Sequence, residues 1–226
     1  MSEDTEAPAA APPLSSNHHD SATPRVLTVL SFVLERLVAR NDTLAAVAAG
    51  WTGKSLKVFH GVRAPSISIP KYLERIYKFT NCSPSCFVVG YVYIDRLLHK
   101  YPDSLLVSLN VHRLLVTSVM LASKVLDDMH YNNSFYARVG GVSNAELNRL
   151  ELEMLFLLDF GVVVSSRIFE SYCLVLEKEM SMWSSGDKVE RPVILINNNS
   201  SADDETEISV EYTQRSSSSP SLTLVD

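Results

Sequence analysis

Two stretches of this 226-residue chain place apolar side chains on nearly every face of a helix. The first begins at Ser83-Pro84 and runs to about Lys100, and the second covers about 111–127, with Asn110 as its predicted cap. Their apolar residues are Phe87, Val88, Tyr91, Val92, Ile94 and Leu98, followed by Val111, Leu114, Leu115, Val119, Met120, Ala122 and Val125. A helix that is apolar nearly all round must be enclosed by other elements, so we expect these two at the centre of the core.

Five further segments have the periodicity of helices that bury one face. They are expected at about 25–40 after Thr23-Pro24, from Pro70, at 134–139 before Gly140-Gly141, from Ser143 to about Leu158, and at about 166–182. Their expected inward residues are Val26, Leu27, Leu30, Val33, Leu34 and Leu37; Tyr72, Leu73, Ile76 and Phe79; Leu147, Leu150, Met154, Leu155 and Leu158; and Ile168, Phe169, Tyr172, Leu174 and Leu176. Ser143 and Glu146 form a predicted capping box. The short connections predict one all-α domain.

The two ends differ in composition from the part between them. Residues 1–24 are rich in Ala, Pro and acidic residues, and residues 184–226 are rich in Ser, Asn and acidic residues, so we expect both to be disordered. The formal net charge of −6 comprises −4 on 1–24 and −5 on 184–226, which leaves +3 on the expected domain, 25–183. The expected domain is only mildly positive and lacks the basic cluster of a typical nucleic-acid-binding protein, so we expect no nucleic-acid partner.

The sequence contains none of the motifs that would indicate an enzyme. A phosphate-binding glycine loop, a nucleophile elbow and a His-Glu-x-x-His pattern are all missing, so we expect no catalytic residues and no cofactor. Cys82, Cys86 and Cys173 favour reduced thiols over a disulfide framework, and the alternative of a zinc site at Cys82 and Cys86 has no second ligand pair. Charged residues interrupt the apolar helices, and no secretory signal is recognisable, so we expect no membrane span.

Two charged residues, Lys124 and Glu151, lie on helices whose other faces are expected in the core. A charge beside a core must reach water, pair within the chain or contact another molecule. Spacing alone favours a solvated Lys124 and a Glu151 paired with Arg149 or Asn148, because most charges at helix ends are solvated. Contact with a partner is the alternative.

Several motifs, in order along the chain, resemble the cyclin box. Tyr93-Ile94-Asp95-Arg96-Leu97-Leu98, Leu121-Ala122-Ser123-Lys124, and Arg149-Leu150-Glu151 with Met154-Leu155 resemble its second, third and fifth helices. Val111-His112-Arg113-Leu114-Leu115, Ser134-Phe135-Tyr136-Ala137 and Val139-Gly140-Gly141 resemble the U-type (P-type) plant cyclins, which are related to the yeast phosphate-signalling cyclins. The resemblance covers about 66–180.

This resemblance implies a single five-helix cyclin box at about 66–160, with an extra helix at each end. It implies a heterodimer with a cyclin-dependent protein kinase, which the side chains of Lys124 and Glu151 would hydrogen-bond. It also implies that Asp95 braces the box through an internal ion pair, for which Arg75 is a candidate partner. The substrate-docking motif of mitotic cyclins is missing at 70–76.

The function implied by the resemblance is that of a regulatory kinase subunit in cell division or in nutrient and phosphate signalling, located in the nucleus, the cytoplasm or both. The alternative is a cyclin-fold adaptor in transcription that activates no kinase, for which the mild positive charge of the domain is weak support. Thr23 and Ser219 each precede a proline and are candidate phosphorylation sites.

Overall fold

The computed structural model describes residues 23–47 and 55–184, and side chains as far as Ser181. This part of the chain forms helices and no strand, which confirms the all-α prediction. The helices are α1 (Arg25–Val47), η1 (Lys57–Phe59, a single 3₁₀ turn), α2 (Ile69–Thr80), α3 (Pro84–Lys100), α4 (Val111–Leu126), α5 (Asn133–Gly140), α6 (Asn144–Leu157) and α7 (Ser166–Ser184). Nearly all of the two ends expected to be disordered, with Ser219, lies outside the described residues.

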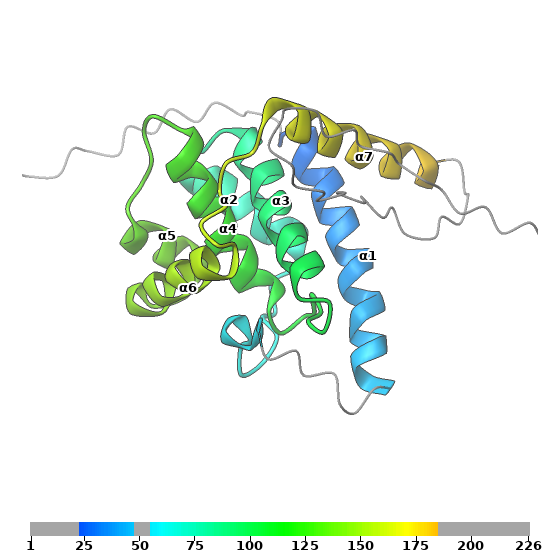
Figure 1. Cartoon of the computed structure of the whole chain (residues 1–226), viewed down its shortest axis with the longest axis horizontal. Helices are drawn as coiled ribbons and strands as arrows, with labels where there is room; N and C mark the ends of the chain where they lie inside the picture. Colours follow the sequence, from blue (N-terminus) through cyan, green and yellow to red (C-terminus); the bar gives the residue numbers. More distant parts are fainter. Residues whose placement is uncertain (1–22, 48–54, 185–226) are drawn as a thin grey trace, which may run out of the picture.

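Helices α3 and α4 lie at the centre of the fold and make its most extensive helix–helix contact (Figure 1). Their close approach depends on Gly90, because a Cβ atom there would lie 3.2 Å from both the Ser118 Oγ and a methyl group of Val119. Most of the side chains of α4, from Val111 to Ser123, are buried. The prediction that these two helices form the middle of the core is confirmed.

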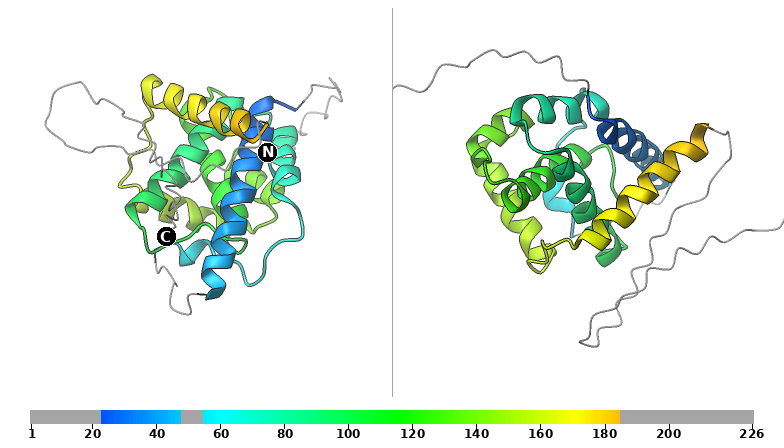
Figure 2. Two further views of the ribbon diagram at one scale, coloured as in Figure 1. Left: turned by 90° about the vertical axis from the view of Figure 1, so that its right-hand side faces the viewer. Right: turned by 90° about the horizontal axis from the view of Figure 1, so that it is seen from above.

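The other helices cover this pair from different sides. Helices α5 and α6 pack against α4 on one side, and α1 and α7 lie on the other, where α7 crosses α1 (Figures 1 and 2). Helix α2 contacts both α1 and α5, and so closes the bundle between the two sides. No helix among the described residues has the length and apolarity needed to cross a membrane.

Two predicted helix caps differ from the structure. Ser143 Oγ accepts from the Glu146 N–H at 3.0 Å, but the Glu146 side chain does not complete a capping box. It pairs instead with Arg113 of α4, at 2.7 Å, because this cation lies within its reach. Asn110 does occupy the N-cap position of α4, but its buried side chain accepts from the Val107 N–H at 2.8 Å, so it fixes the preceding loop and makes no side-chain cap hydrogen bond.

Three residues expected in the core are exposed: Phe79, Val125 and Leu174. Phe79 and Val125 belong to the last turns of α2 and α4. Leu174 lies two positions from both Tyr172 and Leu176, which are buried, and a spacing of two places it on the opposite face of α7. Helix α1 also continues to Val47, beyond the expected end near residue 40.

Candidate partner-binding site

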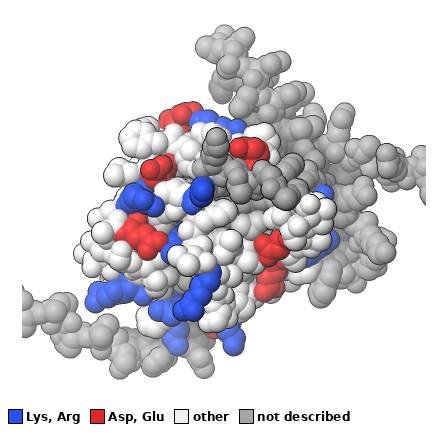
Figure 3. Space-filling view, turned by 90° about the horizontal axis from the view of Figure 1, so that it is seen from below, with Lys and Arg blue, Asp and Glu red and all other residues white. Residues whose placement is uncertain are grey.

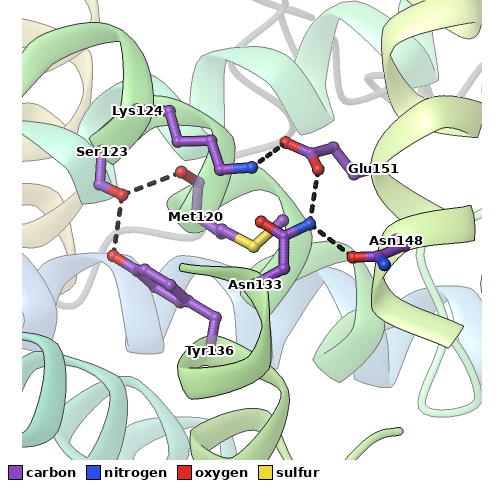
Figure 4. A network of polar contacts seen from close by, with 7 residues as sticks. All are labelled: Met120, Ser123, Lys124, Asn133, Tyr136, Asn148 and Glu151. Atoms are coloured by element: carbon purple, nitrogen blue, oxygen red, sulfur yellow. Dashed lines mark hydrogen bonds and ion pairs between the residues drawn. The ribbon is translucent and has the colours of Figure 1, made fainter. Parts of the chain in front are cut away.

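Lys124 and Glu151, which are 27 residues apart in the sequence, form a direct ion pair. Lys124 Nζ, from the last turn of α4, lies 2.6 Å from Glu151 Oε1, from the middle of α6 (Figure 4). Their side chains are 27% and 15% exposed, so the pair lies at the edge of the core and can still be reached from solvent. The sequence interpretation of a solvated Lys124, with Glu151 paired to Arg149 or Asn148, is therefore wrong in this fold.

The second carboxylate oxygen of Glu151 is held by Asn133. Asn133 Nδ2 donates to Glu151 Oε2 at 2.7 Å and to Asn148 Oδ1 at 2.8 Å (Figure 4). Asn133 is the first residue of α5, so three helices fix the position of this one carboxylate. Sequence reasoning missed Asn133, although the pair Asn132-Asn133 before a short helix was visible.

A buried hydrogen-bond chain fixes the end of α4 beside Lys124. The Tyr136 hydroxyl donates to Ser123 Oγ at 2.8 Å, and Ser123 Oγ donates to the Met120 carbonyl at 2.9 Å (Figure 4). Burial raises the pKa of Tyr136 far above its ordinary value, so the phenol keeps its proton and remains a donor. The backbone that carries Lys124 is thus anchored to α5 through the hydrogen bond between Tyr136 and Ser123.

Exposed apolar side chains lie next to the ion pair in sequence, on α6 and in the turn that follows it. They are Val125, Leu126, Leu152, Phe156 and Phe160. Leu152 and Phe156 are four residues apart, and the Phe156 and Phe160 rings meet edge to face with centroids 5.3 Å apart. Together with Lys124 and Glu151, we call these residues the α4–α6 surface. A charged pair whose neighbours in sequence include exposed apolar residues suits contact with a macromolecule.

The turn after α6 holds Phe160 in an unusual backbone conformation. Asp159 and Phe160 have φ values of 49° and 59°, in the left-handed region. Two cations of α3 hold this turn: Arg96 Nη1 donates to the Gly161 carbonyl at 2.7 Å, and Lys100 forms an ion pair with Asp159. A bulky residue rarely adopts positive φ unless its surroundings enforce it. The turn therefore fixes an aromatic side chain on the surface.

Asp95 is partnered differently from the sequence expectation. Its carboxylate accepts from the Tyr172 hydroxyl at 2.7 Å, and His99 Nδ1 of the next turn lies 3.4 Å away. Arg75 is not its partner, because that guanidinium donates to the Arg138 carbonyl on α5, at 3.4 Å. Burial raises the pKa of Asp95, and the nearby His99 and the Tyr172 hydrogen bond oppose this shift.

The remaining charges give little indication of a nucleic-acid or metal site. On the face shown in Figure 3, acidic groups lie among the basic ones, so this face is not a continuous basic surface. Among the described residues, no group of three His, Cys, Asp or Glu side chains could hold a metal ion. Thr23, the candidate phosphorylation site ahead of α1, is exposed.

Comparison with known proteins gives one consistent result. Residues 24–162 match the family model described as "Cyclin". Cyclin-U1-1 of Arabidopsis thaliana is 74% identical over 163 residues, which cover 72% of this chain and 77% of the relative. Cyclin-P4-1 of Oryza sativa subsp. japonica is 48% identical over 172 residues, covering 76% of this chain and 81% of the relative. The resemblance of the sequence motifs to U-type and P-type cyclins is therefore confirmed, and the chain belongs to the cyclin family.

Proposed function

We propose that this cyclin binds a cyclin-dependent protein kinase through the α4–α6 surface and activates it. Membership of the cyclin family gives the chain a regulatory role, and the proposal adds the partner and the surface. The observation that carries it is the ion pair between Lys124 and Glu151, held at the edge of the core by three helices. In the cyclins that this chain resembles, residues at these two positions hydrogen-bond the kinase.

The geometry suits this role because the charged groups are fixed before binding. Glu151 is held by Asn133, and the backbone next to Lys124 is held by Ser123 and Tyr136. Groups that are already ordered lose less conformational entropy when a partner binds. The ammonium has donors to spare for carbonyl oxygens, and the carboxylate has free lone pairs for backbone N–H groups.

The apolar residues of the surface would supply most of the buried area. Phe156 and Phe160 present a preformed aromatic pair, and aromatic residues are enriched at the centres of protein interfaces. Kinase activation then follows if binding favours the active position of a mobile kinase helix over its inactive position. We further propose that this cyclin and its kinase act together in the nucleus, the cytoplasm or both, in cell division or in phosphate signalling.

The proposal is tested by measuring affinity for a panel of purified cyclin-dependent kinases, with phosphorylation of a generic substrate as the second readout. Truncating one partner of a buried interfacial charge pair costs on the order of 2–5 kcal/mol. Lys124→Glu should therefore lower the affinity by about 30-fold or more and abolish activation. Arg167→Glu, an exposed charge on α7, is a matched control and should bind normally. Normal activation by a folded Lys124→Glu protein would contradict the proposal.

A further inference from the structure

A pocket of about 400 Å³ lies where α1 meets the start of α4. One face of α1, the loop 64–68 and the first residues of α2 and α4 line it. Pockets of roughly 300–1,000 Å³ are the usual size for a small ligand, so this one has room for a few side chains. Lys124 lies in the last turn of α4, at the other end of that helix, so the pocket is separate from the α4–α6 surface.

The lining of this pocket combines apolar and acidic groups. Val38, Ile69 and Val111 supply buried apolar side chains. Glu35 and Asp42, seven residues apart on the same face of α1, add two carboxylates. Among the described residues that line the pocket, none is Lys or Arg. The pocket is therefore both apolar and negatively charged.

No cation compensates either carboxylate. Asp42 accepts hydrogen bonds from the Ser108 N–H, at 3.0 Å, and from the Ser108 hydroxyl, and both of these donors are neutral. Glu35 is exposed and forms no ion pair with any described residue. Burial lowers the pKa of His112, which also lines the pocket, so its ring adds no charge at neutral pH. The complementary occupant is a segment that carries apolar side chains and a positive charge.

The sequence that follows α7 contains such a segment. Within 185–226, Val193–Ile196 is the only run of four apolar residues, and Arg191-Pro192 directly precedes it. The β-branched residues of this run favour an extended chain, in which alternate side chains lie on the same side. Arg191, Val193 and Leu195 would therefore share one side, and Ile194 the other.

The end of α7 lies close enough for this segment to reach the pocket. Glu179, five residues before the end of α7, lies 3.9 Å from the guanidinium of Arg36, which directly follows Glu35 on α1. Figure 2 shows α7 crossing α1. The seven residues from Ser184 to Arg191 can span up to about 23–25 Å. This is about twice the diameter of a helix, roughly 10–12 Å, so the chain can pass around α1.

We propose that the segment 191–195 docks in this pocket as an intramolecular ligand. The Arg191 guanidinium binds the two carboxylates, for which its planar donors are suited. Val193 and Leu195 pack against the apolar lining, which removes their side chains from water. A short tether gives the segment an effective concentration on the order of 1 mM at the pocket, so even a weak contact keeps the pocket occupied. The inference does not depend on the proposed kinase binding.

The docking can be tested on the full chain without any kinase. The double variant Val193→Asp with Leu195→Asp should vacate the pocket. A fluorescent peptide with the sequence of residues 188–197 is then titrated and followed by anisotropy. We expect it to bind the double variant at least about tenfold more tightly than the natural chain, in which the tethered segment competes. Ile194→Asp, on the other side of the segment, is the matched control and should bind the peptide as weakly as the natural chain.

A charge reversal identifies the pocket as the place of binding. Added to the double variant, Glu35→Lys should lower the peptide affinity about fivefold, whereas Glu170→Lys, an exposed acid on α7, should leave it unchanged. Circular dichroism checks that each variant is folded. Equal peptide affinity of the natural chain and the double variant, or no binding to either, would overturn the proposal. A dimer of the natural chain that the double variant abolishes would also overturn it, because the occupant would then be the tail of a second copy.

Discussion

The Tyr172 hydroxyl donates a 2.7 Å hydrogen bond to the Asp95 carboxylate, and this bond joins α7 to the central helix α3. The two residues are 77 positions apart. The Tyr172 ring is buried against Val88 and Val92 of α3, so the same side chain supplies apolar contact and a polar link. Asp95 therefore ties α7 to the cyclin box.

We expect Tyr172→Phe to lower the free energy of unfolding by about 1.5–3 kcal/mol, because a hydrogen bond to a charged group is lost. The loss should be greatest at neutral pH. At that pH the Asp95 carboxylate is charged and accepts the hydrogen bond most strongly. Burial raises the pKa of Asp95 in the folded protein, so the free-energy cost of burying the charged carboxylate is present above that pKa and disappears as the pH falls through it. Urea unfolding at several pH values measures this. Tyr101→Phe, whose hydroxyl makes only a 3.4 Å contact, is the control, and equal stability of the two variants would contradict the prediction.

Much of the architecture could be predicted from the sequence because it depends on local periodicity. The apolar circumference of α3 and α4 placed them at the centre, and Gly140-Gly141 marked the end of α5, where Gly141 has a φ of 72°. These features involve residues within one or two helical turns of each other.

The contacts of the site could not be predicted in the same way. Lys124 and Glu151 were each identified, but their pairing depends on how α4 and α6 pack. The partner of Asp95 depends on α7, which lies outside the expected cyclin box. Periodicity shows which face of a helix is buried, but does not indicate which polar groups meet across two helices.

The imidazole of His112 should make stability depend on pH. Its Nε2 lies 2.9 Å from the Ile67 carbonyl, and its buried Nδ1 has no hydrogen-bond partner among the described residues. Burial lowers the pKa of His112 below 6.5, and the bond to Ile67 only partly opposes this. The unfolded chain then binds more protons than the folded one just below pH 6.5, so stability is full above that value and declines as the pH falls.

We expect His112→Gln to flatten this decline between about pH 7 and 5, as measured by thermal unfolding. Part of the slope should remain, because burial also lowers the pKa of His60. His130→Gln, which changes an exposed side chain, is the matched control. An unchanged pH dependence in the His112 variant would show that this residue is not responsible.

Phe160 should lower the stability of the fold slightly while increasing the affinity for the kinase. Its left-handed backbone conformation costs a residue with a side chain roughly 1–2 kcal/mol, a cost that is smaller for asparagine. Phe160→Asn should therefore be as stable as the natural chain, or slightly more so, while binding the kinase about tenfold more weakly through loss of an aromatic contact. Leu174→Asn, on the exposed face of α7, should leave the affinity unchanged. A large loss of stability in Phe160→Asn would show that the exposed ring supports the fold.

Exchanging the charges of Lys124 and Glu151 should separate their two possible roles. Each single variant, Lys124→Glu or Glu151→Lys, places like charges together and should lower the free energy of unfolding by about 1 kcal/mol, since the pair is partly exposed. The double variant can re-form an ion pair of opposite polarity, so most of this stability should return. Kinase affinity should stay low in all three proteins, because the partner would meet each charge with the wrong sign. If the double variant recovers both stability and affinity, the ion pair only holds α4 against α6. The kinase would then bind other residues of the α4–α6 surface.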